Sequence, residues 1–356
     1  MLNFKYYKIF IIYLSGMYRK RGIEKTILVS MLIIILFLSG CTTKTYNGSD
    51  SDQSVLVSQH SRLNLSFYKG IWTSPGMEER ALKHDTEKVK IDGVNIFAIP
   101  VMYSVRDDGT VKIVFNAQWE GNEENGYINM IRLAHNAGLA VFLEMDPVYL
   151  KNGEFSSVPE KIRKVFMENF KTACLHWVEI AEKEQVEVFS PFNEPTTVLG
   201  VEDAVKWMEE ILPFIKERFN GSVIVKFAGE GPGDAITQYG SIEGYDYVAL
   251  DIYAIDIDQN TFMEYLEFVI GEGNKYVENY NLKGFIFGEM GVDADDEEFQ
   301  SELFQSFFER TWNVTNGYFL CSWGPKNPDD PFADVSFTDK PAEDVIKQWY
   351  TKQLIY

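Results

Sequence analysis

Two glutamates follow apolar segments at points where the sequence turns, and both are placed for acid–base chemistry. Glu194 lies in "FNEP", between Asn193 and Pro195, and Glu289 lies in "FIFGEMGV". Two carboxyl groups can divide a reaction between them: a protonated one gives a proton to a leaving group, and an ionised one attacks or stabilises a cation. Taken singly, each glutamate could be a solvated turn residue, because Asn, Pro and Gly favour turns.

The segments that must position these glutamates alternate between short apolar runs and longer amphipathic stretches. Eight runs read as strands: 66–72, 95–103, 140–145, 186–192, 223–229, 247–253, 284–290 and 318–323. Between them, apolar residues recur at spacings of three and four, most clearly from Ile162 to Ile180, and "DKPAEDV" begins a last helix at Pro341. Eight such units predict a single-domain α/β fold, a (β/α)8 TIM barrel. A doubly wound sheet is the alternative, but no G-x-G-x-x-G follows the first strand.

In such a barrel the chemistry lies at the C-terminal ends of the strands. Those ends offer aromatic and carboxylate residues, namely Trp72, Tyr103, Glu144, Asp146, Asn193, Glu194, Glu230, Asp251, Tyr253, Glu289 and Trp323. Histidine is missing from them, which disfavours a serine triad or a zinc hydrolase. We expect no cofactor, although a magnesium site formed by Glu144, Asp146 and Asp251 remains an alternative. "GEGPGD" (229–234) reads as a turn, because Pro232 removes an amide donor from any phosphate loop.

Glu194 and Glu289 end the fourth and seventh strands, which face one another across the mouth of an eight-stranded barrel. Glycoside hydrolysis needs such a pair, with a separation of ~5 to 5.5 Å for retention of configuration and ~6.5 to 9.5 Å for inversion.

"FNEP" and "GEMG" resemble the acid/base and nucleophile motifs of clan A retaining glycoside hydrolases, which are (β/α)8 barrels that include family 5 and the mannanase-containing family 113. The resemblance covers about residues 66–356. It implies that Glu194 is the general acid/base, that Asn193 binds the sugar 2-hydroxyl and that Glu289 is the nucleophile. It also implies that Tyr253 holds the nucleophile and that Trp323 is a platform under the reacting sugar.

The chain departs from the family 5 pattern at two strand ends. Asp251 replaces a histidine two positions before the tyrosine, and the third strand ends in Glu144 and Asp146 instead of basic residues. The resemblance therefore implies a divergent member of the clan. We include Glu144, Asp146 and Asp251, with the aromatic residues Trp72 and Tyr103, among the candidate substrate-binding residues.

The N-terminal region reads as an export signal. Arg19, Lys20, Arg21 and Lys25 precede the apolar run 26–39, and Leu38–Cys41 resembles the lipobox of prokaryotic lipoproteins. This implies lipidation at Cys41 and a location on the outer face of the cell membrane, at a prokaryotic cell surface or in the periplasm. We divide the chain into a signal peptide (1–40), a polar tether (41–64) and the barrel (65–356). An uncleaved anchor is the alternative, and Met17 could be the true start.

Composition limits the partners. The net charge of −20 disfavours nucleic acid, and Cys174 and Cys321, the cysteines besides Cys41, read as small buried residues. We expect a carbohydrate substrate, the membrane as a partner through Cys41, and no obligate protein partner. The sequence thus predicts a retaining glycoside hydrolase acting on β-linked oligo- or polysaccharides. The alternatives are a non-catalytic glycan-binding or structural surface lipoprotein with the same fold, and a carboxylate–metal lyase or isomerase.

Overall fold

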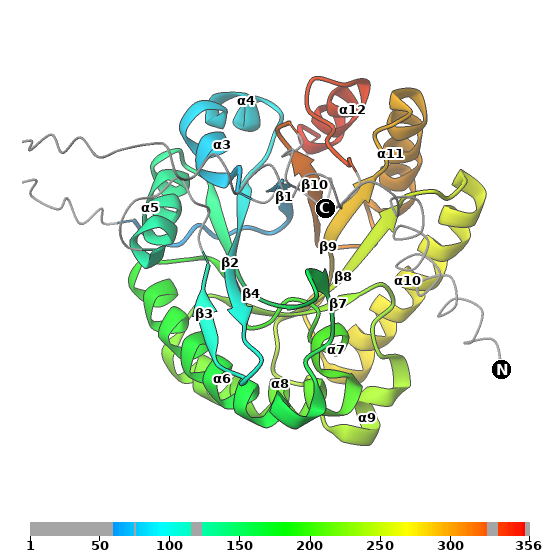
Figure 1. The fold of residues 1–356 in the computed structure, drawn as a ribbon. Coiled ribbons are helices and arrows are strands. Elements are labelled where there is room, and N and C mark those ends of the chain that lie inside the picture. Colours follow the sequence, from blue (N-terminus) through cyan, green and yellow to red (C-terminus); the bar gives the residue numbers. More distant parts are fainter. Residues whose placement is uncertain (1–59, 75, 115–122, 326–333, 353–356) are drawn as a thin grey trace, which may run out of the picture. The chain divides into compact units, whose positions relative to one another are not determined.

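The computed structural model describes residues 60–74, 76–114, 123–325 and 334–352. Its centre is a closed barrel of eight parallel strands, which confirms the predicted (β/α)8 architecture (Figure 1). Each of the eight barrel strands pairs with two others, and the pairing of β2 with β4 completes the ring. The barrel strands in chain order are β1 (Tyr68–Thr73), β2 (Ile96–Val105), β4 (Ala140–Lys151), β6 (Val188–Ser190), β7 (Ser222–Ala228), β8 (Tyr247–Ala254), β9 (Gly284–Val292) and β10 (Gly317–Trp323).

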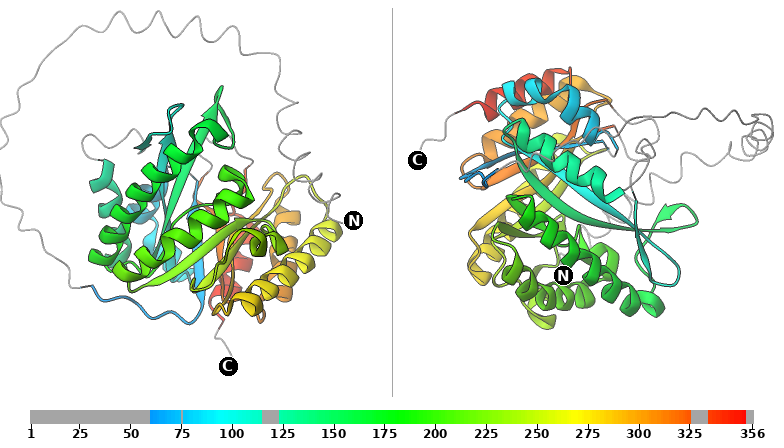
Figure 2. Two further views of the ribbon diagram at one scale, coloured as in Figure 1. Left: turned by 90° about the horizontal axis from the view of Figure 1, so that it is seen from below. Right: turned by 90° about the vertical axis from the view of Figure 1, so that its left-hand side faces the viewer.

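Helices cover the outside of the barrel, as the two further views in Figure 2 also show. They are α3 (Glu78–His84), α4 (Thr86–Ile91), α5 (Glu123–Asn136), α6 (Glu160–Lys183), α7 (Pro195–Leu199), α8 (Val201–Arg218), α9 (Ile236–Tyr239), α10 (Gln259–Tyr280), α11 (Glu297–Thr311) and α12 (Pro341–Tyr350), with a 3-10 turn, η1 (Gly233–Ala235), before α9. On α6 the predicted stripe is buried at Ile162, Phe166, Phe170, Trp177 and Ile180. Burying a large apolar side chain contributes about 1.5–3 kcal/mol, so this face fixes the helix on the barrel.

Two antiparallel additions extend the C-terminal ends of the strands. Strand β3 (Val111–Ile113) pairs with β2, and β5 (Glu154–Phe155) pairs with β4. Both β2 and β4 therefore run beyond the ends expected from the sequence, and paired residues continue the ladder between them as far as Val105 and Tyr149.

Strand alternation separates the barrel interior from the layer between strands and helices. The interior holds one residue in two from each strand, including Tyr68 and Trp72 of β1, Phe142 of β4 and Phe319 and Cys321 of β10. The alternate residues join the outer core against the helices. Because side chains alternate along a strand, residues two and four positions beyond an interior residue also point inward. This rule directs Glu144, Lys226 and Asp251 into the barrel.

The segment before β1, which the sequence analysis assigned to the tether as far as residue 64, is attached to the base of the barrel. The guanidinium of Arg62 donates to the Val186 carbonyl at 2.7 Å and to the Glu182 carboxylate at 2.5 Å. The predicted signal peptide and Cys41 lie outside the described residues. None of the helices formed by the described residues is both long and apolar enough to cross a membrane.

Candidate active site

Glu194 occupies a tight turn between β6 and α7. Its backbone has φ 44° and ψ 54°, a left-handed conformation that a non-glycine residue adopts only at an energetic cost of about 1–2 kcal/mol. Two hydrogen bonds hold the turn: the Asn193 amide donates to the Met145 carbonyl at 2.8 Å, and the Thr197 amide donates to the Glu194 carbonyl at 3.0 Å. Pro195 then begins α7, where its fixed φ suits the first turn. Strain maintained in this way is a frequent property of functional positions.

Glu289 projects from β9 and has both carboxylate oxygens bound. Oε1 accepts from the ammonium of Lys226 at 2.5 Å, and Oε2 accepts from the hydroxyl of Tyr253. The side chain keeps 20% of its exposure, so it can be reached from solvent, unlike the fully buried Lys226. The predicted contact between Tyr253 and Glu289 is therefore present. The Tyr253 hydroxyl also lies 3.4 Å from Cys321 Sγ, and burial together with the charge of Glu289 keeps its pKa well above the usual range.

Lys226, on β7, lies at the centre of the site. Its three ammonium hydrogens go to Glu289, to Glu144 Oε1 at 3.0 Å and to Asn193 Oδ1 at 3.0 Å. Asp251 Oδ2 lies 3.2 Å from the same nitrogen, but with all three hydrogens used it receives no hydrogen bond. The face of the Trp72 indole covers the ammonium, with 4.9 Å from Nζ to the ring centroid.

The carboxyl groups around Lys226 outnumber the cation, and burial favours their protonated forms. Burial and the charge of Glu289, opposed by Lys226, raise the pKa of Glu194 to about 7. Burial raises the pKa of Glu144 to about 8, although Lys226 opposes the rise. The pKa values of Asp146 and Asp251 are also raised, chiefly by burial. Lys226 stays charged: burial alone would lower its pKa, but Asp251, Glu144 and Glu289 hold it well above the ordinary value. Near neutral pH, carboxyl groups of this site are therefore at least partly protonated.

Asn193 has a defined amide orientation, because Oδ1 accepts from Lys226 while Nδ2 donates to Asp146 Oδ1 at 3.2 Å. One hydrogen of Nδ2 remains for a ligand.

Gly288 makes room for this cluster. A Cβ at that position would lie 2.5 Å from Asp251 Oδ1 and 3.1 Å from Lys226 Cε. The register of β8 against β9 shifts beside it, between Leu250 and Asp251, and this shift brings Asp251 opposite Glu289.

The structure thus gathers seven of the predicted residues around Lys226: Trp72, Glu144, Asn193, Glu194, Asp251, Tyr253 and Glu289, with Asp146 bound to Asn193. Trp72 is largely buried, with its indole N–H donating to the Gly288 carbonyl at 2.8 Å, so it forms part of the floor.

Two predicted sugar-binding aromatics lie elsewhere. Tyr103 points out of the barrel: its hydroxyl accepts from the Trp177 indole at 2.9 Å and its ring packs against Phe170. The expected platform, Trp323, is 1% exposed, with its ring edge against Phe337 and Lys88 Nζ 5.2 Å from its centroid. Both predictions are wrong as regards a sugar surface, because both side chains belong to the outer core.

Sequence reasoning overlooked Lys226. The signal was available: Lys226 is the single charged residue in the apolar run "VIVKFAG", and a lysine that is buried needs partners. Its presence also bears on the magnesium alternative. The ammonium already lies between Glu144 and Asp251, where a divalent cation held by those carboxylates would have to sit.

A cluster of two histidines and one glutamate, at the base of the barrel, has the composition of a metal site but not its geometry. The rings of His60 and His135 are stacked 3.8 Å apart and nearly parallel, so their in-plane lone pairs run side by side and cannot converge on one ion. Each Nε2 instead faces a different oxygen of Glu187, at 3.1 and 3.2 Å. The amides of Leu63 and Val141 donate to the same two oxygens. Glu187 is thus a structural acceptor that fastens the segment before β1.

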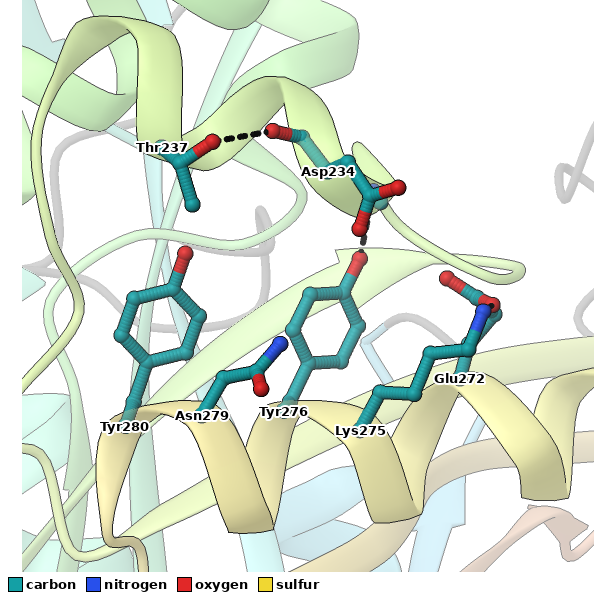
Figure 3. A pocket seen from close by; sticks show the side chains of 8 residues that line it. Asp234, Thr237, Glu272, Lys275, Tyr276, Asn279 and Tyr280 are labelled. Atoms are coloured by element: carbon teal, nitrogen blue, oxygen red, sulfur yellow. Dashed lines mark hydrogen bonds and ion pairs between the residues drawn. The ribbon is translucent and has the colours of Figure 1, made fainter.

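The loop "GEGPGD" after β7 is a turn, as predicted. Figure 3 shows the shallow pocket between this loop and α10, where the Tyr276 side chain rises from the helix. Its hydroxyl accepts from the Gly233 amide at 2.6 Å and donates to the Glu230 carbonyl at 2.9 Å. The Gly233 amide, which a phosphate loop would direct at its ligand, is therefore already used.

The fold is a (β/α)8 barrel, and it gathers a cluster of carboxyl groups around the buried Lys226 at the C-terminal ends of its strands. Comparison with solved structures finds the same fold in glycoside hydrolases. A family 113 β-1,4-mannanase aligns with a TM-score of 0.61 at 18% identity, over 81% of this chain and 100% of the other. The family 113 β-mannanase of Alicyclobacillus acidocaldarius gives 0.62 at 14% identity, over 81% and 98%. The endo-1,4-β-mannanase of Rhizomucor miehei gives 0.58 at 12% identity, over 83% and 99%. No protein-family model and no curated protein matches the sequence.

Proposed function

We propose that this protein is a retaining glycoside hydrolase that cleaves β-linked oligo- or polysaccharides through Glu194 and Glu289. The observation that carries the proposal is the contrast between the two carboxyl groups. Burial and the neighbouring charge favour a proton on Glu194, whereas Glu289 is bound at both oxygens by the donors Lys226 and Tyr253. Two carboxyl groups with such different surroundings suit the roles of acid and nucleophile.

In the first step, Glu194 gives its proton to the glycosidic oxygen while a Glu289 oxygen attacks the anomeric carbon. The bond to the leaving group breaks, the departing sugar keeps the proton, and an ester joins the remaining sugar to Glu289. The free Nδ2 hydrogen of Asn193 is available for a substrate hydroxyl.

The second step uses a change of charge. Once Glu289 is an ester, its negative charge no longer opposes ionisation of Glu194, so the pKa of Glu194 falls and the group becomes a base. Glu194 takes a proton from water, the oxygen of that water attacks the anomeric carbon, and the ester bond breaks to return the Glu289 carboxylate. The two inversions together retain the configuration.

The substrate class is tested by a screen. Mannanases recur among the structural neighbours, so β-mannan is the first polymer to try, beside xylan, galactan, glucan and a panel of aryl β-glycosides. We expect hydrolysis of at least one of these by the wild type, and loss of most turnover in Glu194→Gln and Glu289→Gln with unchanged circular dichroism. Full activity in either variant would refute the assignment. Binding of a glycan without cleavage would instead support the non-catalytic alternative.

Chelator treatment separates this mechanism from the carboxylate–metal alternative. We expect unchanged turnover after dialysis against EDTA, because the Lys226 ammonium serves as the cation of the site. Loss of turnover that is restored by magnesium would favour a metal enzyme.

We also propose that the protein is held on the outer face of the cell membrane by lipid at Cys41. The support is the order of basic residues, apolar run and "LSGC" in the sequence. Incorporation of labelled palmitate in the wild type and its loss in Cys41→Ser would be the expected result, and equal labelling of both would contradict it.

A further inference from the structure

We propose that Lys226 is a positioning residue of this site, which holds Glu289 and Asn193 in one frame and stabilises Glu289 when it departs as a carboxylate from the sugar. The inference rests on the proposed function, because it assigns Lys226 a part in the second step of that reaction.

The first support is the contact geometry. The ammonium links Glu289 of β9 at 2.5 Å, Glu144 of β4 at 3.0 Å and Asn193 of the turn after β6 at 3.0 Å. Since the same ammonium donates to Glu289 and to Asn193 Oδ1, a shift of Lys226 would disturb both side chains at once. The candidate nucleophile and the candidate sugar-binding amide therefore share one rigid support.

The second support is that the barrel interior accommodates the Lys226 ammonium at a position where an apolar side chain would be expected. Ile224, two residues earlier on the same face of β7, is fully buried in the apolar interior, and Lys226 is equally buried. Burying an ammonium is costly unless charges and hydrogen bonds compensate. Gly288 leaves room beside Cε, and the Trp72 ring covers Nζ.

The two steps of the reaction place different demands on this cation. Formation of the ester removes the negative charge of Glu289, so the contact with Lys226 weakens in the intermediate. When water displaces the sugar, the charge returns to the Glu289 oxygens, one of which Lys226 already binds. A donor fixed where charge develops lowers the barrier of that step. Lys226 should therefore matter more for breakdown of the ester than for its formation.

The test compares Lys226→Met, which retains much of the side-chain volume without the charge, with Lys216→Met as the matched control. Lys216 forms an ion pair with Asp246 at the barrel base, and Lys283 also pairs with Asp246, so the control removes a lysine without leaving a carboxylate alone. On an activated aryl glycoside we expect kcat of Lys226→Met to fall about 10- to 100-fold, the loss typical of a hydrogen bond to a charged group. KM should fall with it, and mass spectrometry of the quenched enzyme should show accumulated glycosyl ester.

Lys226→Ala gives a second, chemical readout. Ethylamine or propylamine should restore part of its kcat, because a small ammonium can enter the space of the missing side chain, whereas the matching alcohols should not. A purely structural lysine would give equal losses in both steps and no selective rescue by amines, which would overturn the proposal.

A readout without turnover separates this inference from the proposed function. Removing the cation should leave one more carboxyl group protonated at neutral pH, seen as a stronger carboxylic acid carbonyl band in the infrared spectrum of Lys226→Met than in wild type or Lys216→Met. An unchanged band refutes the charge role of Lys226, even if the enzyme cleaves glycosides. A wild type that cleaves no glycoside refutes the proposed function, even if the band changes. If Lys226→Met does not fold, the double variant Lys226→Met/Glu144→Gln also replaces one of the carboxyl groups that the ammonium binds, and it is expected to show the same loss of kcat.

Discussion

The ionisation of Glu194 should set the alkaline limit of activity. Burial and the Glu289 charge raise its pKa to about 7, so about nine-tenths of the enzyme carries the proton at pH 6 and about one-tenth at pH 8. Between these two values, kcat/KM for a substrate that needs the proton should fall about tenfold. Activity falls as pH rises, because Glu194 can act as a general acid only while it carries its proton.

The assay compares two aryl glycosides of the same sugar over pH 5 to 9. One has a poor leaving group that requires protonation, and the other is a dinitrophenyl glycoside whose leaving group departs without it. We expect the alkaline fall for the first substrate only, and Glu194→Gln should retain ester formation from the second. The same alkaline fall with both substrates, or a fall with the first that survives in Glu194→Gln, would refute the reasoning.

Three further predictions concern stability and packing. Burial raises the pKa of Glu78 to about 7 from 4.5, so wild type loses stability as pH rises through that interval; Glu78→Gln should be more stable by up to about 3 kcal/mol at pH 8 and unchanged at pH 4 in urea unfolding. Glu187→Gln should lower the free energy of unfolding by about 2 kcal/mol at pH 7 and by less in acid. Folding lowers the pKa of Glu187, so its carboxylate contributes stability above the pKa of the unfolded chain and loses that contribution as pH falls through the folded pKa. An equal cost at pH 4 would contradict this. Gly288→Ala should lower kcat/KM at least about tenfold by displacing Asp251, whereas Gly271→Ala, with open space around its new Cβ, should not.

The barrel was predictable because its strands are buried on both faces, which makes them short apolar runs that stand out from the amphipathic helices. The same property hides which face of each strand points inward. Tyr103 follows an apolar run and looks like a strand end, yet β2 continues to Val105 and directs Tyr103 against Trp177. Nothing in the run "NIFAIPVMY" marks the inner face.

The positions of Glu194 and Glu289 near the C-terminal ends of β6 and β9 could be predicted from the apolar runs that precede them, whereas side-chain directions that depend on strand register could not. Trp323 lies beyond a register shift that follows Ile71 in the pairing of β1 with β10, and a local irregularity of this kind redirects a side chain without any sequence signal. Lys226 is the reverse case of Trp323: it was not expected at the site, because a lysine within a strand would have had to point into the barrel. The sequence signals only that this lysine is buried; that it points into the barrel is known only once the structure places Ile224, two residues earlier, on the inner face.

The most direct test of the two-glutamate mechanism is to trap its covalent intermediate. The best aryl glycoside from the screen, prepared with fluorine in place of the sugar 2-hydroxyl, should form the ester and release it slowly, and peptide mass spectrometry can then locate the sugar. The proposed mechanism predicts one sugar on Glu289. A sugar on another carboxyl group, such as Asp251 or Glu144, would contradict it.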